Sequence, residues 1–500
     1  MNIKQFVNKL DNQVNKYCFH PRYSKWIFIF ILLLLSFIYN YHNILFYRPQ
    51  GQHQWRQCDC LSFALNYCVD NNSFFEPSFN YLGSDGTGKT ISEFPIIYLF
   101  VGHLWKIFGQ QEYIYRMITI VIAFSGFFVL FKLVESILKD SIWALSVIIL
   151  LFTSPILVFY TNNFLPDVPA FGCSLIGWYF FWQFYKSEKN KFLFISFLFF
   201  TLGGLLKISS IISFACITLV YFLEITQIVS FKKSIKIFNE PLKQLMLFLF
   251  VISSLFSWYF YVHIYNQKHN NAFFLMGILP VWNLSTNEIH RILLSIKEHF
   301  KWDYFRLGTH FVFISLLFII MINHKKIDKF LLCITIFASV GFLLFFILFF
   351  EALEWHDYYV INLLILMPII CLTFLSSLKK YYYGIFNSVI FRIIVIAFLV
   401  HNVDFARRRI NGCYDGWRNE NHIKYTYSFE KITPYLRSIG IQRDDKVICL
   451  PDNSTNITLY LMNQKGWTNY GNLIDNPTRI QELINNGAKY LILYDKELLY

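Results

Sequence analysis

Long apolar runs separated by short polar stretches dominate the pattern of this 500-residue chain. Runs such as 26–46, 245–265 and 330–350 each approach the roughly 20 apolar residues that cross a bilayer as a helix. The pattern therefore predicts an α-helical polytopic membrane protein. We expect about eleven transmembrane helices, over residues 26–46, 116–135, 141–159, 167–185, 191–206, 209–230, 245–265, 309–323, 330–350, 359–377 and 383–401.

The polar residues gather in three larger segments, 47–115, 266–308 and 402–500, and the remaining connections are short. The first apolar run follows a basic tail and has no small-residue cleavage site after it. We therefore expect a retained anchor and a cytoplasmic N-terminus. With eleven spans, all three polar segments then lie outside the cytoplasm.

The distribution of lysine supports this topology. Lysines such as Lys139, Lys189, Lys325 and Lys379 fall in or at the edge of loops that the topology places inside, as the positive-inside rule requires. The run 407–409, three arginines after the last span, is the exception. The rule weighs short loops more heavily than the edge of a folded domain, so the exception weakens the topology without reversing it.

Two short helices that lie along the membrane are expected in the first polar segment, over 55–68 and 94–108. Between them, the glycine-rich stretch 83–89 superficially suggests a phosphate loop. It lacks the preceding strand and the full spacing of such a loop, so we interpret it as a plain turn-rich connection.

The C-terminal region changes character. Residues 447–450 and 490–494 are typical of short buried strands, and 480–486 of a helix before the second strand. We predict a small α/β domain of roughly 90 residues. The chain then divides into a transmembrane module, 1–401, whose first extracytoplasmic loop is 47–115, and a C-terminal extracytoplasmic domain, 402–500.

Composition agrees with a membrane location: 56% of residues are hydrophobic and only 15% are charged, against roughly 25% charged in soluble proteins. The net charge of +13 follows largely from the lysine bias and suits anionic lipid headgroups, so nucleic acid is not an expected partner. The ten cysteines show no zinc spacing. For Cys58, Cys60 and Cys68 in the first loop, a disulfide and free thiols both stay open.

An ordered series of motifs resembles the bacterial GT-C membrane glycosyltransferases. More narrowly, it is similar to the protein mannosyltransferase and aminoarabinose transferase group, the glycosyltransferase family 39-like proteins, including their Rgt-like members. The motifs are His53-x-Trp55-Arg56-Gln57-x-Asp59, Glu93-Phe94-Pro95, Phe108-Gly109 with Arg116, Leu165-Pro166-Asp167, Gly203-Gly204-Leu205-Leu206-Lys207 and His356-Asp357-Tyr358-Tyr359.

The resemblance implies transfer of a sugar from a polyprenyl-phosphate carrier to an acceptor at the outer face of the membrane, usually with inversion. The family's first loop usually carries an adjacent Asp-Glu pair, whereas this chain offers Asp59 alone. Inverting transfer needs a carboxylate that takes the proton of the acceptor hydroxyl. We expect Asp59 to be this base, with Asp167 as its competitor. Interaction with a helix dipole and helix capping are the respective structural alternatives.

Cationic side chains are needed to stabilise the departing lipid phosphate. Arg56, Arg116 and Lys207 are expected in this role because each lies near the outer interface, and a cation in or beside a span is a functional candidate. The alternative is that their long side chains snorkel to the interface, most readily for Arg116 at the end of a span.

Further substrate contacts are expected from polar residues in the outer loops. His53, His356, Asp357 and Tyr359 are candidates to line the sugar pocket, and Glu93 is a candidate substrate ligand or a helix cap. Two histidines and a carboxylate in separate loops are weak support for a metal. We therefore expect no cofactor, with a divalent ion as the alternative.

The sequence thus predicts a multi-pass glycosyltransferase of the bacterial cytoplasmic membrane, with its active site and C-terminal domain extracytoplasmic. Its expected partners are a polyprenyl-phosphate sugar donor, a glycolipid, polysaccharide or protein acceptor, and the membrane itself. Two other classes stay open. One is a lipid or polysaccharide transporter, although the chain shows no internal repeat. The other is an inactive glycan-binding scaffold of the same fold.

Overall fold

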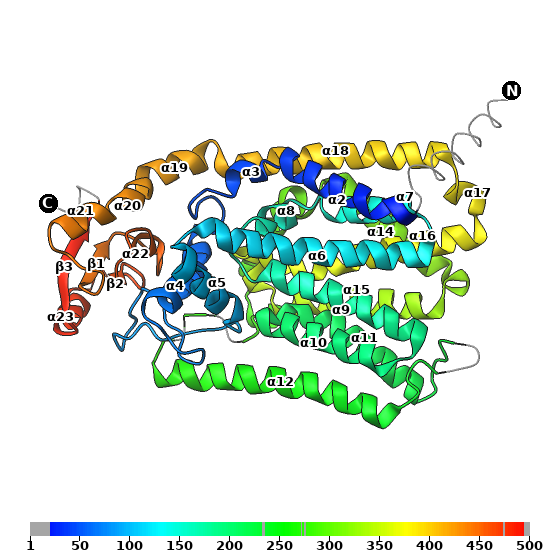
Figure 1. Ribbon diagram of the computed structural model, residues 1–500, viewed down its shortest axis with the longest axis horizontal. Helices are drawn as coiled ribbons and strands as arrows, with labels where there is room; N and C mark the ends of the chain where they lie inside the picture. The colour runs from blue at the N-terminus through cyan, green and yellow to red at the C-terminus, as the bar shows by residue number, and fades with distance from the viewer. Residues whose placement is uncertain (1–20, 233–235, 272, 275–276, 474–475, 495–500) are drawn as a thin grey trace.

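Helices that run along one axis form the main body of the protein in the computed structural model (Figure 1). The structure describes residues 21–232, 236–271, 273–274, 277–473 and 476–494. Among these residues, six helical segments are long and apolar enough to cross a membrane. They are α6 (Glu112–Leu138), η1 with α11 (Ile208–Ile225), α12 (Pro241–Lys268), α15 (Lys329–Leu348), η6 with α16 (Asp357–Tyr381), and a segment that begins with α18 (Val389–Tyr414).

Two further pairs of helices satisfy the same test only when each pair is taken together. Helices α7 (Ser141–Leu151) and α8 (Pro155–Thr161) meet at 83°, and α13 with η3 (Thr286–Tyr304) meets α14 (Leu307–Ile322) at 96°. Pro155 has no N–H and disfavours helical geometry in the residue before it, which accounts for the first break. Each pair is a broken span or a re-entrant segment.

The remaining apolar helices are shorter or more polar. They are α2 (Pro21–Ile38), α5 (Ile96–Phe108), α9 (Asp167–Ser187) and α10 (Asn190–Leu206). Short helical turns complete the connections: α3 (Tyr41–Ile44), η2 (Val281–Asn283), η4 (His324–Lys326), η5 (Glu351–Glu354) and α17 (Tyr383–Phe386).

The prediction of a helical polytopic membrane protein is confirmed. Each of the eleven predicted ranges falls on one or more helices, but only six to eight spans pass by length and composition among the described residues. The count of eleven therefore stays a prediction. The basic tail before residue 21, used to orient the chain, lies outside the described residues.

The first loop folds as two helices, as predicted: α4 (Gln54–Val69) and α5. The two helices approach closely at Gly102, where a Cβ atom would lie 2.7 Å from Cβ of Tyr67 and 2.8 Å from the carbonyl oxygen of Ala64. The absence of a side chain at Gly102 thus allows α5 to pack directly on α4.

The C-terminal region contains a three-stranded parallel sheet in the order β2-β1-β3. Strands β1 (Lys446–Leu450) and β3 (Ala488–Leu493) and the helix α23 (Pro477–Asn485) match the sequence prediction, whereas β2 (Gly466–Thr468) was missed. A strand of three residues is too short to show an alternating pattern. The other helices of this region are α19 (Trp417–Tyr425), α20 (Tyr427–Lys431), α21 (Thr433–Ser438) and α22 (Ile457–Leu461).

Helix α18 runs without interruption to Tyr414, so the sequence-based boundary between residues 401 and 402 falls inside a helix. Figure 1 shows the sheet, α4 and α5 at one end of the helical body, with α17 at the opposite end. The first loop and the C-terminal region therefore share one end of the molecule.

The first loop and the C-terminal region are joined through backbone pairing and a shared core. Tyr81 forms a parallel bridge with Gly466, and the Leu82 amide donates to the Gly466 carbonyl at 2.9 Å. Phe63 of α4 and Trp467 of β2 are both buried in the same hydrophobic cluster. The loop thus extends the edge of the sheet, so the two regions pack as one unit at this end.

Arg392, a charge inside the last predicted span, has a partner in the bundle. Its guanidinium lies 2.8 Å from Asp140, whose side chain also caps α7 by accepting from the Trp143 amide. Both members of this ion pair are largely buried. The pair compensates the cost of burying the arginine.

Candidate active site

The N-terminal part of α4 carries the first group of charged residues. Arg56 and Asp59 are one helical turn apart and so lie on the same side of α4. The Arg56 guanidinium forms a close ion pair with Glu93, lies 3.9 Å from Oδ2 of Asp59, and covers the ring of Phe274. All three charged side chains are buried. The result is a compact cluster of one cation and two carboxylates.

Glu93 lies in the loop just before α5. The loop is fixed to the helical body because the Phe94 amide donates to the Leu205 carbonyl of α10 at 3.0 Å. Burial opposes ionisation of Glu93, but the nearby charges of Arg56 and then Lys207 outweigh it and lower the pKa of Glu93 to about 2. Glu93 is therefore a carboxylate at any physiological pH.

A second ion pair joins the starts of α9 and η1. Asp167 is the first residue of α9, and its Oδ1 lies 3.3 Å from Nζ of Lys207, which follows the last residue of α10. The ammonium also lies over the rings of Tyr359 and Tyr358, at 4.4 and 5.2 Å from their centroids. These contacts hold Lys207 as a largely buried cation. Among the described residues, neither Asp167 oxygen has a hydrogen-bond donor apart from this ion pair.

Asp59 has a different environment, built by the C-terminal region. Its Oδ1 accepts hydrogen bonds from Oγ1 of Thr455 at 2.8 Å and from Nδ2 of Asn456 at 2.9 Å. Burial is the largest influence on this carboxyl group and raises its pKa to about 6, although Arg56 and the two hydrogen bonds oppose the shift. Asp59 is thus a more basic carboxylate than an exposed aspartate.

A third carboxylate, Asp357, collects three donors. Its Oδ1 lies 3.0 Å from Nε2 of His53 and accepts from the Tyr160 hydroxyl at 2.8 Å, while Oδ2 accepts from Nε2 of Gln52 at 2.5 Å. His53 adopts a positive φ of 52° immediately before α4. This strained backbone directs the histidine toward the start of η6, where Asp357 lies.

His356 lies beside this network, with its ring 6.0 Å from that of His53. Burial and then the nearby His53 and Lys207 lower the pKa of His356 to about 3. His356 is therefore neutral at physiological pH, and its ring stacks on Tyr359 at 5.0 Å.

A cavity of about 580 Å³ opens beside these ion pairs. Glu93, Lys207 and Tyr359 line its polar part together with Ser92, Ser209, Tyr259 and His263. Its remaining wall is apolar and comes from Ile208, Ile278, Phe345 and Phe349. Because Phe345 belongs to α15, the apolar wall is continuous with a helix that is long and apolar enough to cross a membrane.

Arg116 does not join this cluster. It is fully buried in α6, donates to the backbone carbonyls of Asn162 and Tyr47, and lies over the ring of Phe164. The guanidinium thus links the segment after α3, at Tyr47, to the turn between α8 and α9, at Asn162, and does not extend to the protein surface. The predicted contact of Arg116 with phosphate remains untested, and the geometry gives it a structural position.

Nine of the ten predicted site residues, all except Arg116, therefore belong to neighbouring groups linked by ion pairs, hydrogen bonds or ring contacts. Sequence analysis missed Thr455, Asn456 and Tyr358. Tyr358 lies within a quoted motif and could have been included. Thr455 and Asn456 follow Asp59 by almost 400 residues and carry no local signal.

The described residues include most of the cysteines, and the histidines and carboxylates considered as possible metal ligands. All nine described cysteines have free thiols, including Cys58, Cys60 and Cys68. In the same part of the chain, no group of three or more histidine, cysteine, aspartate or glutamate side chains is arranged to hold a metal ion.

Comparison with known proteins agrees with this architecture. The family described as dolichyl-phosphate-mannose-protein mannosyltransferase matches residues 92–258, a segment that contains Glu93, Asp167 and Lys207. The fold is similar to that of ArnT from Cupriavidus metallidurans bound to undecaprenyl phosphate. The resemblance to GT-C membrane glycosyltransferases is confirmed. The expected enzyme class, a glycosyltransferase, is supported by the same family match.

The similarity to ArnT covers 94% of this chain and 90% of ArnT, with a TM-score of 0.59 and 12% sequence identity. Archaeal oligosaccharyltransferase AglB from Archaeoglobus fulgidus, in complex with an inhibitory peptide and a dolichol-phosphate, gives a TM-score of 0.50 at 10% identity. That similarity covers 94% of this chain and 70% of AglB. At these identities the similarity establishes the fold. No curated protein sequence matches the chain.

Proposed function

We propose that this protein transfers a sugar from a polyprenyl-phosphate-linked donor to a glycolipid, polysaccharide or protein acceptor at the outer face of the cytoplasmic membrane, with inversion. The observation that carries the proposal is the two-part cavity, which has a buried lysine in its polar part and phenylalanines on its apolar wall. A lipid phosphate has the same division into an anionic head and an apolar chain. The undecaprenyl phosphate of ArnT and the dolichol-phosphate of AglB are ligands of this type.

Lys207 is the residue best placed for the donor phosphate. Its ammonium has three N–H donors, and the ion pair with Asp167 engages one side of it. The remaining donors can bind a phosphate oxygen in the cavity that Lys207 lines. In this partly dry site, a charge-assisted contact stabilises the phosphate as the bond to the sugar breaks.

The acceptor hydroxyl must lose its proton during transfer, and Asp59 suits this role chemically. A general base works best when its pKa is near the operating pH. With its pKa raised to about 6, Asp59 is ionised at neutral pH and still more basic than an ordinary aspartate. Asp167 is the competing base because its oxygens have few donors, but its charge is already engaged by Lys207.

The activity is tested directly with purified protein and a panel of polyprenyl-phosphate sugars, with products detected by mass. We expect at least one donor to yield a glycosylated acceptor or free lipid phosphate. At limiting donor concentration, Lys207→Met should lose most of this product formation because donor binding is weakened, whereas the exposed control Lys489→Met should not. Wild-type protein that releases lipid phosphate from none of the donors would contradict the proposed function.

The outer location is tested separately by labelling. Single cysteines at the exposed positions Thr87 and Asn453 in a cysteine-free protein should react with an impermeant thiol reagent in intact spheroplasts. Both positions lie at the end of the molecule shared by the first loop and the C-terminal region. Protection of both cysteines until lysis would reverse the proposed orientation and leave the proposed chemistry intact.

A further inference from the structure

The C-terminal region reaches into the candidate active site at one point, the carboxylate of Asp59. Thr455 and Asn456 both donate hydrogen bonds to the same oxygen, Oδ1. All three residues are at least 97% buried. The other oxygen, Oδ2, receives no hydrogen bond in the described residues and faces Arg56 at 3.9 Å.

The two donors are themselves held in one orientation. The indole N–H of Trp55 donates to Oγ1 of Thr455 at 2.7 Å, so the threonine hydroxyl directs its own hydrogen toward Asp59. The Tyr81 amide donates to Oδ1 of Asn456 at 3.0 Å, which places the amide nitrogen of Asn456 toward the carboxylate. Neighbours in the first loop therefore fix which atom each donor presents.

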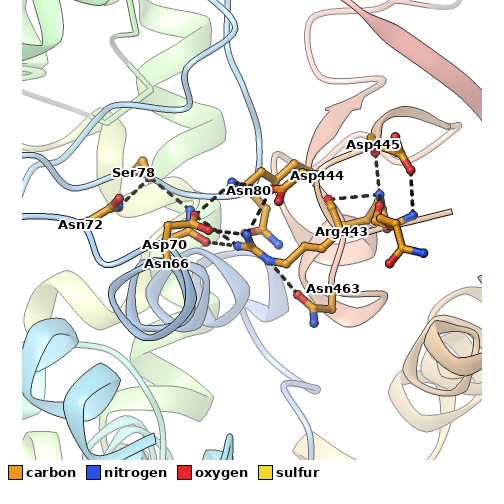
Figure 2. Close-up of polar contacts among 12 residues, drawn as sticks. Asn66, Asp70, Asn72, Ser78, Asn80, Arg443, Asp444, Asp445 and Asn463 are labelled. Carbon is orange, nitrogen blue, oxygen red and sulfur yellow. Dashed lines mark hydrogen bonds and ion pairs between the residues drawn. The ribbon is translucent and has the colours of Figure 1, made fainter. Parts of the chain in front are cut away.

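A separate contact fixes the other end of α4 to the C-terminal region. Figure 2 shows Arg443 between α4 and the sheet, where its guanidinium donates to Asp70 and to Asn66 at 2.6 Å each. Its Nε donates to Oδ1 of Asn463 at 3.1 Å. The C-terminal region thus contacts α4 at both ends. Arg443 binds its last turn, and Thr455 and Asn456 bind Asp59 near its first turn.

We propose that Thr455 and Asn456 are positioning residues of the glycosyltransferase site, which hold Oδ1 of Asp59 so that Oδ2 is presented to the acceptor hydroxyl. This inference rests on the proposed function, with Asp59 as the base. The C-terminal region then completes the active site of the transmembrane module.

The chemistry of the donors matches a base that must alternate between two protonation states. Neutral hydroxyl and amide donors stabilise a carboxylate less than a lysine does, so they orient Asp59 without suppressing its basicity. Charged groups that face Asp59 are Arg56 on its own helix and Glu93 from the loop before α5; the C-terminal region presents the neutral Thr455 and Asn456. Because both hydrogen bonds lower the pKa of Asp59, their loss should raise it.

The test uses Thr455→Val, which removes one donor at nearly constant volume, and Thr455→Ser, which keeps the hydroxyl. The matched control is Thr458→Val, because Thr458 is a buried threonine of the same region that donates to another aspartate, Asp452. Rates of sugar transfer are measured as kcat and donor KM from pH 4.5 to 9 on the full-length protein.

We expect Thr455→Val to lower kcat about tenfold, to leave donor KM within twofold, and to move the acidic limb of the kcat profile upward by roughly one pH unit. Thr455→Ser should restore the wild-type profile, and Thr458→Val should leave the limb in place. Arg443→Gln should weaken docking without moving the limb, because Arg443 does not contact Asp59.

A Thr455→Val profile that coincides with that of Thr458→Val would overturn the inference. Full turnover of Asp59→Asn would overturn it as well, because Asp59 would then serve only to anchor the C-terminal region. Both results require an active wild-type enzyme. They are therefore distinct from failure of the proposed function, in which the wild-type protein transfers no sugar.

Discussion

Asp59 and Asp167 are both buried aspartates next to a cation, yet they are held in opposite ways. Asp59 receives two hydrogen bonds from neutral side chains, and its nearest cation, Arg56, lies 3.9 Å away and is paired with Glu93. In the part of the chain that the structure describes, the Asp167 carboxylate is paired with Lys207 alone, at 3.3 Å. The first carboxylate is oriented and left basic, whereas the second neutralises a cation in the cavity wall.

From this difference we infer that Asp59 acts on the acceptor and that Lys207 binds the phosphate of the donor. A base needs a fixed direction and a pKa near the working pH. The hydrogen bonds from Thr455 and Asn456 provide the direction, and burial raises the pKa of Asp59 to about 6. A phosphate site needs a cation whose burial is compensated when no phosphate is bound, and the ion pair with Asp167 compensates the burial of Lys207. We therefore expect substitutions on the Asp59 side to lower kcat, and those on the Lys207 side chiefly to raise donor KM and so to reduce product formation at limiting donor concentration.

The largest expected effect is on turnover in Asp59→Asn. The substitution keeps shape but removes the proton acceptor, so kcat should fall roughly 100-fold or more while donor KM is largely kept. Asp167→Asn is the matched control and should lower kcat less. Steady-state kinetics with one donor decide between them, and a collapse in Asp167→Asn with near-normal Asp59→Asn would transfer the role of base to Asp167.

Donor use should change most in Lys207→Met. A charge-assisted contact in a partly dry site contributes about 1.5–3 kcal/mol, so donor KM should rise roughly 10- to 150-fold. Lys489→Met is the control, since that lysine is 63% exposed and bonded only to Asp445 in the C-terminal region. Equal donor KM values in the two variants would remove Lys207 from the phosphate site.

The pH profile tests Asp59 as the base without mutation. Below its pKa of about 6, Asp59 is protonated and cannot accept a proton, so kcat should fall about tenfold for each pH unit below 6 and level off above it. Glu93, with a pKa of about 2, and His356, with a pKa of about 3, do not titrate in this range. A flat kcat from pH 4.5 to 8 would exclude Asp59 as the base.

The smallest effect is expected from Arg443→Gln, at the other end of α4. The variant loses the partly buried pair with Asp70, which keeps a second cation, Lys465, at 3.2 Å. Stability should fall by about 1.5 kcal/mol, the lower end for hydrogen bonds to charged groups, and thermal unfolding should detect it. Donor KM should stay at the wild-type value; an increase like that of Lys207→Met would show that docking of the C-terminal region controls the phosphate site.

Several features of the fold were predictable from local pattern. The sequence predicted five elements close to their observed bounds: α4, α5, β1, β3 and α23. Each segment contains its own hydrophobic periodicity and the breaker residues that end it. The bend between α7 and α8 was not expected, although Pro155 marks it in the sequence.

The residues of the candidate site were also found largely from their order along the chain. Arg56, Glu93, Asp167 and Lys207 stand in motifs, and a charged residue beside a membrane span is unusual enough to be noticed. Arg116 is likewise a charged residue beside a predicted span, but its guanidinium binds two backbone carbonyls and lies apart from the cluster. The sequence does not indicate which backbone carbonyls will lie next to a buried guanidinium.

The sequence by itself determined that this is a helical polytopic membrane protein, since long apolar runs of the required length can be recognised from hydrophobicity alone. Only the tertiary structure decided which charges pair and which donors reach Asp59. Thr455 and Asn456 meet it across almost 400 residues, through pairing of Tyr81 with the edge strand β2. Such contacts depend on how distant segments pack, and the residues around Asp59 or around Thr455 do not by themselves indicate which distant segment they will contact.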